Sequence, residues 1–100
     1  MVESFYESKT KCLTIKIIGR FDYSCHKQFK EAFSQNHKAA LYEVDFAEVT
    51  YLDSSALGML LLLRDHANKD VVQVRLININ DAVVDILRIA NFHRLFEFAE

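Results

Sequence analysis

The chain has 100 residues, of which 51% are hydrophobic, and this is enough apolar material for one compact core without disulfides or metals. Its 12 basic and 14 acidic residues give a net charge of −2 without long runs of either sign, which argues against nucleic-acid and membrane-surface partners. The first residues lack a signal-peptide pattern, and the longest apolar run, 59–63, is far shorter than the roughly 20 residues that span a bilayer. We therefore expect a soluble, cytoplasmic protein with one domain over residues 1–100.

The spacing of cysteine and histidine predicts neither a metal site nor a redox pair. Cys12 and Cys25 form no Cys-x-x-Cys motif, so we expect two reduced thiols in the core. His37, His66 and His93 lie far apart in the chain without metal-ligand spacing, and we interpret them as surface or boundary residues.

The first third of the chain predicts two strands and a helix. Residues 2–8 are a weak strand candidate, and 13–17 alternate between apolar and polar, as in a strand with one buried face. Gly19 is expected to close this second strand in a turn with positive φ. Apolar residues then recur at helical spacing, and Asp22 or Ser24 can cap that helix.

The rest of the chain alternates between strands and helices. The predicted segments are a strand at 40–46, a helix at 54–68, a strand at 71–79, a helix from Asn80 or Asp81, and a short strand at 95–99.

The predicted order is β-β-α-β-α-β-α-β, which indicates an α/β domain whose mixed, mostly parallel β-sheet has helices packed on it. Sites in such sheets lie at the carboxyl ends of parallel strands, where the following loop enters a helix. Asp53-Ser54 and Asp22-Tyr23-Ser24 both lie at such strand-to-helix junctions. We therefore expect the two loops to share one end of the sheet.

Ser54 and Ser55, which begin the helix at 54–68, have several possible roles. Asp and Ser are favoured helix caps, so the simplest interpretation is structural. A catalytic Ser54 has little support, because the chain lacks a Gly-x-Ser-x-Gly elbow and a histidine paired with an orienting acid. A receiver domain with a phosphoacceptor aspartate is also disfavoured, because Asp45 lies inside its strand and no acidic pair follows the early strands.

The helix at 54–68 is apolar almost all round, although a helix that flanks a sheet needs a single apolar stripe. Its surplus apolar residues indicate either a surface that docks a partner or deep burial in a small domain. Gly58 lies near the start of the helix, where glycine costs roughly 1 kcal/mol relative to alanine. We expect a close approach there, either of the sheet or of another molecule.

Two motifs make the chain similar to the STAS-domain family of bacterial anti-sigma factor antagonists. The segment Asp53-Ser54-Ser55-Ala56-Leu57-Gly58 resembles the family pattern Asp-Ser-Ser/Thr-Gly-Leu-Gly, and Gly19-Arg20-Phe21-Asp22 resembles its Gly-x-Leu/Phe-Asp stretch. The resemblance implies a STAS-like fold over nearly the whole chain. It also implies that Ser54 is phosphorylated by an anti-sigma factor with serine-kinase activity, and that a PP2C-type phosphatase reverses this step.

In this family the unphosphorylated form binds the anti-sigma factor and thereby frees the sigma factor, and phosphorylation blocks this binding. The protein itself then needs no cofactor and is not an enzyme, because ATP and Mg²⁺ belong to the kinase. Around Ser54, the expected partner-binding residues are Asp22, Ser24, Asp53, Ser55, Ala56, Gly58, Met59 and Leu63. Ala56 departs from the glycine usual in the family, so that a methyl group is added near the phosphorylation site.

The sequence leaves the target of this switch open. STAS domains also act in partner-switching complexes that control secretion, biofilm formation or a signalling enzyme, and these need the same serine and docking face. In both cases the physical expectation is the same. A helix N-terminus tolerates a phosphate, so the fold survives, whereas a partner that needs a dry contact is repelled.

Overall fold

The computed structural model describes residues 1–35, 39–69 and 72–99. These residues form a five-stranded sheet of order β1-β2-β3-β4-β5, in which β1 is antiparallel to β2 and the other neighbouring pairs are parallel. The strands are β1 (Val2–Glu7), β2 (Cys12–Phe21), β3 (Leu41–Leu52), β4 (Gln73–Ile77) and β5 (Glu97–Ala99). The helices are α1 (His26–Ser34), α2 (Ser54–Lys69) and α3 (Asp81–Ile89), with short 3-10 turns at Tyr23–Cys25 and Phe92–Arg94. The predicted order of elements and the mixed, mostly parallel sheet are confirmed.

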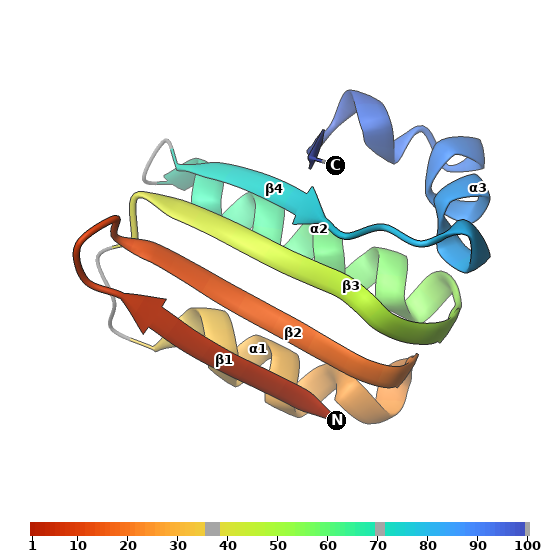
Figure 1. Cartoon of the computed structure of the whole chain (residues 1–100), viewed down its shortest axis with the longest axis horizontal. Coiled ribbons are helices and arrows are strands. Elements are labelled where there is room, and N and C mark those ends of the chain that lie inside the picture. The colour runs from red at the N-terminus through yellow and green to blue at the C-terminus, as the bar shows by residue number, and fades with distance from the viewer. Residues whose placement is uncertain (36–38, 70–71, 100) are drawn as a thin grey trace.

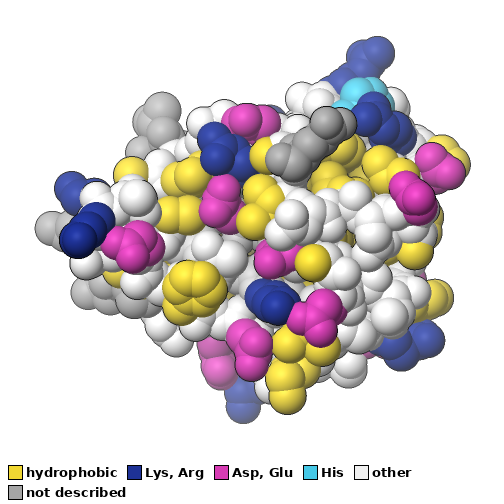
Figure 2. Space-filling model, in the orientation of Figure 1, with side chains coloured by type: hydrophobic (Ala, Val, Ile, Leu, Met, Phe, Trp, Pro, Cys, Tyr) yellow, Lys and Arg dark blue, Asp and Glu magenta, His cyan; other side chains and the backbone are white. Residues whose placement is uncertain are grey.

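Helices α1 and α2 lie side by side on one face of the sheet, and α3 lies near the end of β3 where the chain leaves that strand (Figure 1). The core lies between the sheet and the two helices. In β2, for example, Leu13, Ile15 and Ile17 are buried while Thr14 and Lys16 are half-buried, which is the alternation expected of a strand with one face against a core. The opposite face of the sheet shows charged and apolar side chains interspersed (Figure 2).

The second strand is longer than predicted and continues through Gly19 to Phe21. Gly19 does adopt a positive φ, of 85°, but it lies inside the strand rather than in a turn. The register between β2 and β3 shifts between Gly19 and Arg20, so the glycine forms part of a bulge. The expected turn is therefore wrong, although the expected backbone conformation is confirmed.

The third strand is also longer, because β3 runs to Leu52, past the predicted end at residue 46. Ala47 and Glu48 are both exposed, which interrupts the alternation of buried and exposed residues along β3. The interruption coincides with another register shift against β2, between Lys16 and Ile18. A bulge here re-phases the burial pattern without ending the strand.

The fourth strand is shorter than predicted and ends at Ile77, because Asn78 adopts a left-handed conformation with φ of 54°. Residue 71, where the predicted strand begins, lies outside the described residues. Asn80, rather than Asp81, caps α3, since its side chain accepts a hydrogen bond from the backbone N–H of Ala82 at 2.9 Å.

Cys12 and Cys25 are free and buried, which confirms the prediction of two core thiols. His66 is half-buried against the rings of Phe33 and Tyr42, and His93 is exposed, whereas His37 lies outside the described residues. In the part of the chain that the structure describes, no helix is long and apolar enough to cross a membrane.

Candidate functional site

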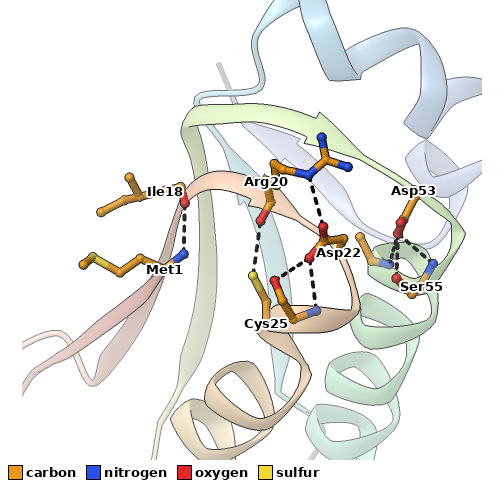
Figure 3. Close-up of polar contacts among 9 residues, drawn as sticks. Met1, Ile18, Arg20, Asp22, Cys25, Asp53 and Ser55 are labelled. Atoms are coloured by element: carbon orange, nitrogen blue, oxygen red, sulfur yellow. Dashed lines mark hydrogen bonds and ion pairs between the residues drawn. The ribbon is translucent and has the colours of Figure 1, made fainter.

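The strands β2 and β3 end side by side, and the loops that follow them carry the residues of the candidate site. Phe21 pairs with Leu52 at the ends of these parallel strands. Asp22 and Asp53 directly follow these two residues, so both lie at the same end of the sheet (Figure 3). This placement confirms that the two loops share one end of the sheet.

Asp53 caps the start of α2. Its Oδ1 accepts hydrogen bonds from the backbone N–H groups of Ser55 at 3.0 Å and Ala56 at 3.3 Å, which are free donors in the first turn of the helix. Its backbone carbonyl accepts from the N–H of Leu57 at 3.3 Å. The cap of this helix is thus the aspartate, and the interpretation of Ser54 as the capping side chain is wrong.

The two serines that follow this cap differ in their surroundings. The hydroxyl of Ser55 donates to Asp53 Oδ1 at 2.6 Å, and its side chain is half-buried. Ser54 is the first residue of α2 and is exposed, and its hydroxyl has no hydrogen-bond partner among the described residues. An unbonded, exposed hydroxyl is accessible to a modifying enzyme, whereas Ser55 must first give up its bond to Asp53.

The loop after β2 repeats the same local arrangement. Asp22 Oδ1 accepts hydrogen bonds from the backbone N–H of Ser24 at 3.0 Å and from its hydroxyl at 2.5 Å (Figure 3). Asp22 thereby caps the turn Tyr23–Cys25 that leads into α1. In both loops the residue between the aspartate and the serine is exposed, so Tyr23 occupies the place that Ser54 occupies in the other loop.

The carboxylates of both loops are held in their ionised form. The pKa of Asp53 lies below its usual value mainly because the Ser55 hydroxyl donates to it, while partial desolvation and the charge of Asp22 act in the opposite direction. The pKa of Asp22 is lowered by the hydroxyl and the N–H of Ser24 and then by the guanidinium of Arg20. The effect of Asp22 on Asp53 indicates that the two loops bring negative charges near one another.

The burial of α2 corrects part of the expected partner surface. Ala56, Met59 and Leu63 are exposed by 2% or less, because they lie on the stripe of the helix that faces the sheet. Their side chains cannot contact a partner in this conformation, so the expectation for these three residues is wrong. The extra methyl group of Ala56 likewise faces the core and does not crowd Ser54.

The outward stripe of α2 begins at Ser54 and continues through Gly58 to Leu61, which is 38% exposed. A Cβ atom added at Gly58 would meet nothing within 4 Å. Packing onto the sheet therefore does not explain this glycine. The sequence did not predict that Leu61 is exposed. Apolar residues surround this helix, so their pattern does not indicate which side faces the sheet.

Sequence reasoning also missed two exposed tyrosines near Ser54. Tyr23 is 72% exposed and stacks on His26, with ring centroids 5.4 Å apart. Tyr51, close to the end of β3, is 40% exposed, and the guanidinium carbon of Arg20 lies 3.9 Å from the centre of its ring. Tyrosine and arginine are enriched at the energetic centres of protein interfaces. The available signal was the position of both tyrosines between a predicted strand and the predicted helix that follows it.

Comparisons with known proteins agree with this architecture. The family model described as "Mlab, STAS domain" matches residues 4–97. The STAS-domain containing protein PA14_20770 of Pseudomonas aeruginosa (strain UCBPP-PA14) is 48% identical over 91 residues, which cover 87% of each chain.

Solved structures with 13% identity share the fold. The anti-sigma factor antagonist SpoIIAA in its unphosphorylated form has a TM-score of 0.75 and covers 100% of this chain and 88% of its own. The phosphorylated form of SpoIIAA from Bacillus has a TM-score of 0.70, with 100% and 92% covered. The Thermotoga maritima protein tm1081 has a TM-score of 0.84, with 100% and 86% covered. Since the family model spans residues 4–97 and the Pseudomonas relative is 48% identical, the chain belongs to the STAS-domain family.

Proposed function

We propose that this protein is an anti-sigma factor antagonist whose binding is switched by phosphorylation of Ser54. The main support is that two adjacent serines at the start of α2 differ in exposure and hydrogen bonding. Ser54 is exposed and its hydroxyl bonds to none of the described residues, while the hydroxyl of Ser55 is held at 2.6 Å from Asp53. In support, the structurally similar SpoIIAA is an anti-sigma factor antagonist known in unphosphorylated and phosphorylated forms.

The partner in this proposal is an anti-sigma factor with serine-kinase activity, and it contacts the end of the sheet around Ser54. The surface it covers comprises Tyr23, Tyr51, Gly58 and Leu61, which are the exposed groups beside the serine. Asp22, Ser24, Asp53 and Ser55 border this surface and hold the two loops in place through the hydrogen bonds between each aspartate and its serine. Gly58 allows the partner backbone to approach the helix closely.

Phosphorylation acts through charge at this surface. A phosphate adds about −1.5 to −2 charges at pH 7, next to the two ionised aspartates. The start of α2 tolerates an anion, because the helix dipole and the free N–H groups of its first turn favour negative charge. The partner would have to desolvate the added charge, and the switch needs no large rearrangement of the fold.

Mass spectrometry after incubation with the kinase tests this proposal. The unmodified protein should retain an ATP-dependent kinase from a lysate of the source cells, and this kinase should place one phosphate on Ser54. A Ser54→Ala variant should retain the kinase without accepting phosphate. Phosphate on Ser55, with Ser54 unmodified, would contradict the assignment.

The same switch acting on a target other than a sigma factor is the second candidate. The comparisons leave it open, because neither the description of the matching family model nor the name of the Pseudomonas relative mentions a sigma factor. The identity of the retained kinase and of the protein that it releases distinguishes the two. In both cases the protein acts in the cytoplasm by binding proteins rather than by catalysis, without nucleic-acid or membrane partners, and a PP2C-type phosphatase resets it.

A further inference from the structure

Arg20 lies at the same end of the sheet as Ser54 and is held in place from two sides. Its Nε donates to Asp22 Oδ2 at 3.2 Å, and its guanidinium carbon lies 3.9 Å from the centre of the Tyr51 ring. The side chain is nevertheless 62% exposed. This flexible side chain is thus already oriented in the unphosphorylated protein. Part of the entropy cost of binding an anion is therefore met before the anion binds.

The backbone is also built to place this arginine. Gly19 has a positive φ of 85° and pairs with Val49 of β3. The pairing then skips one residue of β3, so that Arg20 pairs with Tyr51. The Cys25 thiol donates to the carbonyl of Arg20 at 3.3 Å (Figure 3). Bulges that redirect a side chain are enriched next to functional sites.

One edge of the guanidinium remains free. The hydrogen bond to Asp22 uses Nε, and the two Nη groups have no hydrogen-bond partner among the residues that the structure describes. In Figure 3 the terminal nitrogens of Arg20 point away from Asp22. A planar pair of Nη groups is the geometry that binds two oxygens of a phosphate at once.

We propose that this free edge of Arg20 binds the phosphate of phosphorylated Ser54. The inference rests on the proposed function, since it assigns a receptor within the chain to the same phosphate. Phosphorylation adds charge beside Asp22 and Asp53, and Arg20 is a cation that already pairs with Asp22. Arg20 can keep its Nε on Asp22 while its Nη groups hold the phosphate, so the arginine then bridges the loops after β2 and β3.

The bridge has two consequences for the switch. Arg20 is withdrawn from any partner that would contact its free edge, so phosphorylation removes a binding group as well as adding a charge. The arginine also favours the doubly ionised phosphate, because an adjacent cation stabilises the form with more negative charge. The second pKa of the phosphoserine should therefore lie below that of the same phosphoserine without Arg20.

Titration by ³¹P NMR of a protein with genetically encoded phosphoserine at position 54 tests the bridge. The second pKa of the phosphate should rise by roughly 0.5 unit or more in Arg20→Gln. Arg20→Lys should give an intermediate pKa, because lysine retains the charge but lacks the two-pronged geometry. Arg64→Gln is the matched control, since Arg64 lies ten residues beyond Ser54 on α2, about 15 Å along the helix and outside the screening length of about 10 Å at 0.1 M salt.

An unchanged pKa in Arg20→Gln, or an equal rise in Arg64→Gln, would overturn the proposal. A lysine variant that titrates like the wild type would exclude the two-pronged contact. In the protein that retains Arg20, the Nη–H signals of this arginine should shift when position 54 carries phosphoserine in place of serine. Unchanged signals would contradict the bridge. Because the phosphoserine is introduced during translation, failure here is distinct from failure of a kinase to modify Ser54.

Discussion

Asp22 and Asp53 leave the ends of β2 and β3 side by side, and each accepts hydrogen bonds from the backbone N–H and the hydroxyl of the serine two residues later. The hydrogen bond from the Ser55 hydroxyl lowers the pKa of Asp53, and the negative charge of Asp22 opposes this shift without cancelling it. Two loops that are far apart in the sequence thus form one surface with the same local structure in each. Ser54 projects from one loop and Tyr23 from the other.

The stability of the protein should depend on pH through Asp53. Because the pKa of Asp53 is lower in the folded protein than in the unfolded chain, its ionised form stabilises the fold above the unfolded pKa. This contribution is lost as the pH falls through the folded pKa. Asp53→Asn should therefore be less stable than the wild type at neutral pH, and the difference should shrink in acid. Urea unfolding across this range measures it, with Asp65→Asn on the same helix as the control. A difference that grows in acid would contradict the assignment.

The two serines should contribute unequally to stability. Ser54→Ala should change the free energy of unfolding by less than about 0.5 kcal/mol, because the Ser54 hydroxyl has no partner in the described structure. Ser55→Ala should cost about 1 kcal/mol, through loss of the hydrogen bond to Asp53. Thermal and urea unfolding compare the two variants. If Ser54→Ala were the more costly, Ser54 would be the helix cap after all.

Gly58→Ala should separate stability from binding. Alanine should stabilise α2 by about 0.5–1 kcal/mol, because the added methyl group meets open space and glycine is a poor helix former. The same methyl group should weaken binding of the anti-sigma kinase, since it stands where the partner approaches the helix. Melting curves and titration calorimetry measure the two effects. A more stable variant that binds unchanged would show that the partner does not reach Gly58.

The order of elements and the position of Ser54 could be predicted from the sequence, because both depend on local patterns. Alternation marks the strand around Leu13–Ile17, and an Asp-Ser pair before an apolar run marks a helix start. The inward face of α2 could not be predicted. Met59 is buried while Leu61 is exposed, yet both are large apolar residues on a helix without a polar side. Only the position of the helix on the sheet distinguishes them.

The bulges in β2 and β3 could not be predicted from the sequence either. Gly19 signals positive φ, but the same conformation serves a turn or a bulge, and the pairing with β3 decides between them. The orientation of Arg20 over Tyr51 depends on that pairing. The cluster of Arg20 with Asp22 and Tyr51 is therefore a product of long-range register, which a single sequence pattern does not contain.

Substitutions on the two faces of α2 should have opposite effects. Leu61→Asp should leave the fold intact and weaken partner binding at least tenfold, because Leu61 lies on the outward stripe with Ser54. Met59→Ala should cost about 2–5 kcal/mol of stability through the cavity left in the core, and any binding defect should follow from unfolding. Circular dichroism and calorimetry with each folded variant check this. Equal binding by Leu61→Asp and the wild type would exclude this stripe from the interface.

Charge on Ser54 should block binding without unfolding the protein. The most direct measurement compares the affinity of the anti-sigma kinase for the unmodified protein and for the protein with encoded phosphoserine at position 54, by titration calorimetry. A charge that must be desolvated at an interface costs several kcal/mol, so the phosphorylated protein should bind about a hundredfold more weakly or worse, with an unchanged circular dichroism spectrum. Equal affinities for the two folded forms would contradict the account.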